Sequence, residues 1–176
     1  MKADHLSLKA KVASRAGASD FLKNPGDAVI VDRQGPRWLI LSCPCGCGAE
    51  LPINLDRRAG PAWRLYASAK KGISVYPSVW RDTDCKSHFI IWRNKIFMMG
   101  VRDDEFWDED TESSRTELDK LVLSRLLRDR QQSAEQISDQ LPGSIPWDVL
   151  MSCRRLSWRG LAVEGQGSSL GRFKLP

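Results

Sequence analysis

The sequence lacks the features of a membrane or exported protein. It has no apolar run approaching the roughly 18 residues that a membrane span needs, and 28% of its 176 residues are charged. The first residues, Met1 to His5, include an acid and lead into no long apolar stretch, which argues against a secretory signal. We therefore expect a globular protein of the cytoplasm.

Two further absences limit the chemistry. The five cysteines are odd in number, so they cannot all pair, and a reducing cytoplasm disfavours a disulfide framework. The chain has only two histidines and no His-Glu-x-x-His motif, the pattern of many metalloproteases. It also has no glycine-rich phosphate loop, which argues against nucleotide chemistry.

The net charge of +5 is distributed unevenly along the chain. Residues 1–102 carry 17 basic and 8 acidic residues, residues 103–112 carry seven acids and no base, and residues 113–176 carry 10 basic and 7 acidic residues. A dense block of like charge resists packing and is typical of a solvated linker. We expect domains at 1–102 and 114–176, joined by an acidic linker at 103–113.

The first segment has the pattern of short strands. Ala28–Val31 and Trp38–Leu41 flank a turn-like sequence, and similar short runs follow at 51–55, 63–66, 73–76, 88–92 and 96–99. Such spacing predicts a small all-β sheet or barrel. The first 24 residues fit either a frayed helix or a tail.

Two cysteine clusters indicate a metal site. Cys43, Cys45 and Cys47 alternate with Pro and Gly directly after a predicted strand, and Cys85 lies three residues before His88. Glycine permits the backbone to fold around an ion, and thiolate and imidazole ligands favour zinc. The alternative is that these residues are buried free cysteines, which behave as small apolar side chains. The Gly and Pro residues between them are instead typical of a turn. Cys153 lies in a helical pattern and is expected in a core.

The ligand set has two solutions. Two of the first three cysteines, with Cys85 and His88, would complete a closed tetrahedral site. Alternatively all three bind, and His88 is free to act as a base. An iron–sulfur cluster is the alternative cofactor, because a Cys-x-x-His loop resembles one Rieske loop; the second Rieske loop, Cys-x-His, is missing.

Several motifs together carry a family resemblance. In order they are Cys-Pro-Cys-Gly-Cys-Gly at 43–48, Trp63-Arg64-Leu65, Tyr76-Pro77-Ser78-Val79, Cys85-Lys86-Ser87-His88-Phe89-Ile90 and Asn94-Lys95-Ile96. Over residues 28–100 this resembles a family of small bacterial zinc-binding proteins of unknown function, encoded beside ubiquitin-like proteins, ThiF-like activating enzymes and conjugating-enzyme-like partners. The resemblance implies a metal-binding β domain that processes or deconjugates a ubiquitin-like protein.

Ser78 and His88 are the candidate catalytic residues if this domain is a hydrolase. Ser78 matches the Pro-Ser pair of the family and follows Pro77 at a strand end, although an ordinary turn hydroxyl is the more common role of a serine next to a proline. His88 is the nearby base, but a zinc-bound nitrogen could not accept a proton. Asp82 and Asp84 could orient a base or support a metal ligand.

Residues 114–176 predict three helices and a hairpin. Capping boxes begin at Ser114 and Ser133, a third helix opens at Pro146 and ends near Gly160, and residues 161–175 are typical of a hairpin. This order resembles the winged helix-turn-helix of bacterial transcription regulators. The expected fold class is therefore α+β, a small all-β metal-binding domain followed by a winged helix.

A winged helix that binds DNA places its third helix in the major groove. The expected solvent face of that helix is Trp147, Asp148, Met151, Ser152 and Arg155, and the candidate nucleic-acid contacts are Arg154, Arg155, Arg172 and Lys174. Since this segment has a charge of only +3 and winged helices also dock proteins, DNA and protein partners both stay open.

Two functions follow from these observations. The first is a zinc-binding peptidase, deconjugase or recognition factor in a bacterial ubiquitin-like pathway, with the ubiquitin-like protein and its conjugation enzymes as partners. The second is a non-enzymatic, zinc-dependent transcriptional regulator that binds DNA through the winged helix. The sequence alone does not decide whether the protein is an enzyme.

Overall fold

The computed structural model describes residues 2–99 and 111–176, and the chain divides into two compact units, Met1–Phe106 and Trp107–Pro176. Each unit has its own hydrophobic core. We expected an acidic linker at residues 103–113, of which residues 103–110 lie outside the described part of the chain. Its last residues start α1 (Glu112–Leu123), which is capped by Thr111 and not by the expected Ser114.

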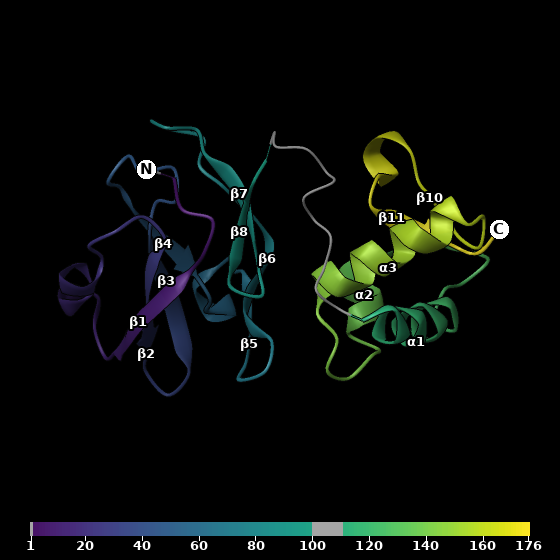
Figure 1. Cartoon of the computed structure of the whole chain (residues 1–176), viewed down its shortest axis with the longest axis horizontal. Coiled ribbons are helices and arrows are strands. Elements are labelled where there is room, and N and C mark those ends of the chain that lie inside the picture. The colour runs from purple at the N-terminus through teal and green to yellow at the C-terminus, as the bar shows by residue number, and fades with distance from the viewer. Residues whose placement is uncertain (1, 100–110) are drawn as a thin grey trace. The chain divides into compact units, whose positions relative to one another are not determined.

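The first unit contains two four-stranded sheets (Figure 1). One has the order β1-β2-β3-β4, with strands Ser7–Val12, Asp27–Asp32, Pro36–Ser42 and Glu50–Asn54. The other has the order β5-β6-β7-β8, with strands Arg64–Ser68, Gly72–Trp80, His88–Trp92 and Lys95–Met98. All neighbours pair antiparallel except β1 and β2, which run parallel.

Both sheets contribute to one core. Within each strand, alternate residues point to the same face of the sheet. Leu51 and Ile53 of β4 are buried and Pro52 between them is exposed. Residues from both sheets join in a single buried cluster, among them Leu39, Leu41, Val75, Phe89 and Ile91. The N-terminal segment also joins the sheets, since the amide of Leu6 donates to the carbonyl of Asn94 at 2.6 Å.

The second unit combines helices with very short strands. It contains α1, β9 (Gln132–Ser133), α2 (Ala134–Ser138), α3 (Pro146–Trp158), β10 (Val163–Glu164) and β11 (Arg172–Lys174). β11 lies between β10 and β9 in an antiparallel sheet. The core of the second unit is formed by residues from all three helices and β11, including Val122, Ile137, Val149, Leu156 and Phe173.

The predicted fold class, α+β with a winged helix-turn-helix, was wrong. Over the described residues the protein is mostly β, with eleven strands in three sheets and few helices. The expected terminal hairpin is reduced to strands of two and three residues, and the second helix has five residues. No clear winged helix is present in residues 111–176.

The face of α3 that was expected to be exposed to solvent is largely buried. Trp147 and Asp148 are 8% and 4% exposed, and Ser152 is fully buried. Ser152 Oγ donates to Asp119 of α1 at 2.7 Å, and Arg155 Nη2 binds the same carboxylate at 2.7 Å. This face of α3 therefore packs against α1, and the helical spacing of polar residues was mistaken for a solvent face.

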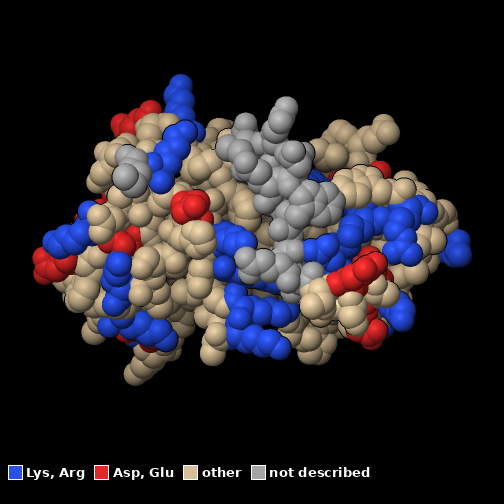
Figure 2. All heavy atoms as spheres, in the orientation of Figure 1, with Lys and Arg blue, Asp and Glu red and all other residues tan. Residues whose placement is uncertain are grey.

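Charge is mixed on the visible surface of each unit. On the face drawn in Figure 2, Lys and Arg side chains outnumber Asp and Glu side chains and occur on both units, with acidic side chains among them. Among the described residues, none of the helices is both long and apolar enough to cross a membrane.

Candidate active site and metal centre

An irregularity in β6 places Ser78. Val75 and Val79 of β6 pair with Ile91 and Phe89 of β7. Four residues along β6 therefore correspond to two along β7, so β6 carries two extra residues at this point. Pro77, inside the bulge, has no N–H to donate to a sheet ladder. Bulges of this kind redirect a side chain out of the regular alternation, and here the residue that follows Pro77 is Ser78.

Ser78 and His88 are in direct contact. Nε2 of His88, the first residue of β7, lies 2.9 Å from Oγ of Ser78, and both side chains are half-buried. The carbonyl of Ser78 accepts a hydrogen bond from Nε1 of Trp63 at 3.2 Å. An imidazole nitrogen at hydrogen-bond distance from a hydroxyl is the geometry by which a base activates a nucleophile.

Asp84, one of the two acids considered as support for a base or a metal ligand, has an arginine partner. Asp84 forms an ion pair with Arg81 in the turn between β6 and β7. Among the described residues no carboxylate is hydrogen-bonded to Nδ1 of His88. The described residues thus form a Ser–His pair, beside which the indole of Trp80 lies with its ring centroid 6.1 Å from the imidazole.

Four cysteine thiols converge in the same unit. The Sγ atoms of Cys43, Cys45, Cys47 and Cys85 all lie within 4.8 Å of one another. Cys43 follows β3 directly, and its carbonyl accepts from the amide of Gly46 at 3.1 Å. Gly46 and Gly48 have φ angles of 84° and 80°, a conformation that L residues with a side chain rarely adopt. These glycines allow three thiols of one short loop to face Cys85.

The spacing of the sulfurs fits a four-thiolate site. Tetrahedral zinc with Zn–S bonds of about 2.3 Å requires sulfurs about 3.8 Å apart. The Sγ atom of Cys43 is 3.3 Å from that of Cys45 and 3.8 Å from that of Cys85. The buried hydroxyl of Ser87 lies 3.4 Å from Cys43 Sγ and 3.3 Å from Cys85 Sγ. Four cysteines this close together could bind a metal ion.

The protonation of these thiols also favours a cation. Burial raises the pKa of Cys43, and burial together with neighbouring thiols raises the pKa of Cys45 to about 12. The hydrogen bond with Ser87 lowers the pKa of Cys85 to about 6. One thiolate therefore forms readily at neutral pH, whereas further thiolates would repel it. A bound divalent cation removes this penalty.

The structure separates the residues that the sequence grouped together. Cys43, Cys45, Cys47 and Cys85 meet in one cluster, whereas the His88 ring contacts Ser78. Of the candidate nucleic-acid residues, Arg155 is paired with the buried Asp119. Arg154 is half-buried, Arg172 is exposed and Lys174 is half-buried. Without a winged helix, DNA binding has no support.

Sequence analysis missed three residues that contact the Ser–His pair or the thiol cluster. Neither Trp63 nor Ser87 was given a role at the site, yet both hydrogen-bond to site residues. Trp80 is 69% exposed, and its position two residues after Ser78 would have placed it on the same face of a strand. The contacts of Trp63 and Ser87 depend on the register of distant strands and leave no local pattern.

The fold and the cysteine cluster define a mostly β protein with a site of four cysteines that could bind a metal ion. The model of one protein family, described as "Bacterial ubiquitination-like system serine protease (BubE)", matches residues 15–99. Over that segment, the chain is thus similar to a component of a bacterial ubiquitination-like system, in agreement with the resemblance found in the sequence. The matched segment contains Ser78, His88 and the four clustered cysteines. No curated protein and no solved structure matches the chain.

Proposed function

We propose that the protein is a serine peptidase that processes or deconjugates the ubiquitin-like protein of a bacterial ubiquitination-like system. Ser78 is the nucleophile and His88 the general base. The observation that carries the proposal is the 2.9 Å contact between His88 Nε2 and Ser78 Oγ. It is supported by the description of the matched family as a serine protease.

In the proposed reaction, Oγ of Ser78 attacks the carbonyl carbon of the scissile bond, and its proton passes to Nε2 of His88. The imidazolium then gives this proton to the leaving nitrogen or oxygen as the bond to the carbonyl carbon breaks, and an acyl ester remains on Ser78. Water attacks the ester and loses a proton to Nε2. The imidazolium returns that proton to Oγ as the ester bond breaks, and the acyl group leaves as a carboxylic acid, which loses its remaining proton to water.

Zinc is the ion proposed for the four-cysteine cluster, with Cys43, Cys45, Cys47 and Cys85 as ligands. Four thiolates complete a tetrahedral coordination shell, so such an ion is structural and has no open position for substrate. The proposal is supported by the sulfur spacing described above. Elemental analysis that finds iron in place of zinc would favour an iron–sulfur cluster.

The partners proposed for this protein are the ubiquitin-like protein and the enzymes that conjugate it. The basis is the system named in the family description. A peptidase of this kind acts on the acyl group at the C-terminus of the ubiquitin-like protein, either in a precursor or in a conjugate. The interaction requires an extended, accessible tail, because the hydroxyl of Ser78 must reach a main-chain carbonyl.

The test is cleavage of the ubiquitin-like precursor of the same system by purified protein, followed by mass spectrometry. Ser78→Ala and His88→Ala should each lower the rate at least about 100-fold, since the pair acts as a unit. The matched control is His5→Ala, because His5 is the other of the two histidines and its side chain contacts the exposed Asp4. Wild-type cleavage that persists in Ser78→Ala would overturn the proposed function.

A further inference from the structure

Beyond Tyr76, the outer edge of β6 has no partner strand among the described residues, and at Ser78 the main-chain carbonyl accepts from Nε1 of Trp63 at 3.2 Å. β5 pairs with β6 only as far as Arg64 opposite Tyr76. The chain before β5 turns away, since the amide of Trp63 donates to the carbonyl of Asn54 at the end of β4. Among the described residues, no strand therefore covers the edge of β6 from Ser78 to Trp80.

Hydrogen bonds on the other side of β6 fix which main-chain groups face this edge. The amide of Arg81 donates to the carbonyl of Ser87 at 2.9 Å, so Arg81 belongs to a hydrogen-bonded pair with β7. Hydrogen-bonded and non-hydrogen-bonded pairs alternate in antiparallel sheets. Trp80, paired with His88, consequently directs its N–H and C=O away from β7 and toward the open edge.

The indole of Trp80 lies on the same face as the reactive pair. Directly opposed residues of an antiparallel pair share a face, and the Trp80 ring centroid is 6.1 Å from that of His88. The side chain of Trp80 is 69% exposed. A large aromatic side chain so exposed beside a polar pair is a typical anchor for a binding partner. With a rise of about 3.3 Å per residue, Trp80 lies about 7 Å along the strand from Ser78.

We propose that the open edge of β6 at Trp80 binds the extended tail of the substrate as an added strand. The N–H and C=O of Trp80 pair with the substrate main chain, and its indole packs on a substrate side chain about two residues from the scissile bond. This inference rests on the proposed peptidase function and specifies its substrate as an extended, unfolded tail. A folded segment could not make the main-chain pairs.

The test separates tail binding from the chemistry at Ser78. A small fluorophosphonate probe reacts with an activated serine and makes no contact at the strand edge. Trp80→Ala should lower kcat/KM for the ubiquitin-like precursor about tenfold through a higher KM, which corresponds to about 1.4 kcal/mol. The rate of Ser78 labelling by the probe should change less than twofold, and Trp80→Phe should recover most of the lost kcat/KM.

The matched control is Trp158→Ala, since Trp158 is also 69% exposed but lies in the second unit; its kcat/KM should equal that of the wild type. Unchanged tail cleavage by Trp80→Ala would overturn the inference alone. Equal losses of cleavage and labelling in Trp80→Ala would also overturn it, because Trp80 would then act through the Ser–His pair. Absence of labelling in the wild type would overturn the peptidase itself, and with it the substrate edge.

Discussion

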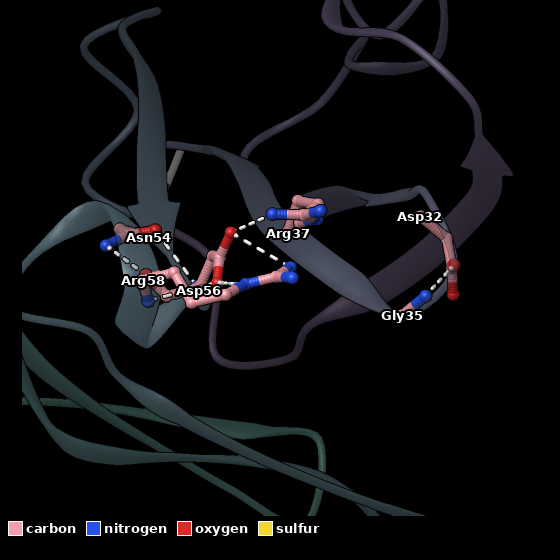
Figure 3. Close-up of polar contacts among 6 residues, drawn as sticks. All are labelled: Asp32, Gly35, Arg37, Asn54, Asp56 and Arg58. Atoms are coloured by element: carbon pink, nitrogen blue, oxygen red, sulfur yellow. Dashed lines mark hydrogen bonds and ion pairs between the residues drawn. The ribbon is translucent and has the colours of Figure 1, made fainter.

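Asp56 organises the loop that follows β4 (Figure 3). Its carboxylate accepts from the amide of Arg58 at 3.1 Å and from Nε of Arg58 at 2.9 Å, and it forms an ion pair with Arg37 of β3. The Arg58 side-chain hydrogen bond is the main cause that lowers the pKa of Asp56 to about 2, with Arg37 adding to it. A carboxyl group held ionised in this way makes folding depend on pH.

The Asp56 contribution should appear as an acid-sensitive part of the stability of the first unit. The folded pKa of about 2 lies below the usual aspartate pKa of 3.8, so the contribution is complete above about pH 4 and is lost as pH falls toward 2. We expect Asp56→Asn to be less stable than wild type at pH 7 and to converge with it near pH 2. Urea unfolding followed by tryptophan fluorescence at several pH values measures this difference.

The matched control for this experiment is Asp20→Asn, because Asp20 is exposed and has no ion pair among those recorded for the described residues. Its unfolding curve should follow the wild type at every pH. A constant difference between wild type and Asp56→Asn from pH 7 to pH 2 would show that Asp56 acts by shape and not by charge.

Sequence patterns located candidate residues where the chemistry is local. The alternation of Cys43, Cys45 and Cys47 with Pro and Gly is visible within six positions, and all three thiols join the cluster. The sequence did not show that Cys47 joins the cluster while His88 contacts Ser78, because this depends on the strand face to which each side chain points. Asp119 left no pattern at all, since a buried acid in a helix resembles an exposed one in sequence.

At the scale of the element, the turn between β6 and β7 links the thiol cluster to the reactive pair. Cys85 is a member of the thiol cluster, the Ser87 hydroxyl contacts two of its sulfurs, and His88 begins β7. Asp84 and Lys86 have φ angles of 50° and 49°, so the turn adopts a conformation uncommon for residues with side chains. An ion held by Cys85 would stabilise this conformation and thereby position His88.

This linkage predicts the effect of Cys85→Ser. Loss of one thiolate ligand should reduce the bound metal from about one ion per chain to well below one. The rate of Ser78 labelling should fall about tenfold or more, because the turn that carries His88 loses its anchor. Elemental analysis and fluorophosphonate labelling of the same preparation measure both quantities.

The matched control is Cys153→Ser, since Cys153 is a cysteine of the second unit outside the cluster. Its metal content and labelling should equal those of the wild type even if the second unit is destabilised. Loss of metal in Cys85→Ser with unchanged labelling would contradict the linkage between the turn and His88.

Element prediction succeeded where apolar runs are short and bounded by turns, and failed where burial depends on partners. The apolar runs at 28–31 and 38–41 coincide with β2 and β3. β1 was not anticipated, because most of its residues are exposed and its parallel pairing with β2 requires the intervening segment to cross over. In α3, the amphipathic pattern gave no indication that Asp119 of another helix binds the polar face.

At the scale of the whole molecule, the two units have separate cores and separate polar networks. The thiol cluster and the Ser–His pair found among the described residues both lie in the first. The second is organised around the buried Asp119, which contacts Ser152, Arg155 and Arg159 at 2.7, 2.7 and 3.6 Å. We infer that each unit unfolds as its own cooperative domain.

Calorimetry of the full chain tests this division, because each unit can be perturbed separately. A metal chelator should lower the midpoint of one transition only, that of the unit with the thiol cluster. Asp119→Ala leaves Arg155 without its buried partner at a cost of about 3 kcal/mol, which should lower the other midpoint by more than about 10 °C. Asp129→Ala, at an exposed site of the same unit, should shift neither midpoint. A single transition that responds to both the chelator and Asp119→Ala would mean that the units fold as one, because only a shared cooperative structure transmits both perturbations.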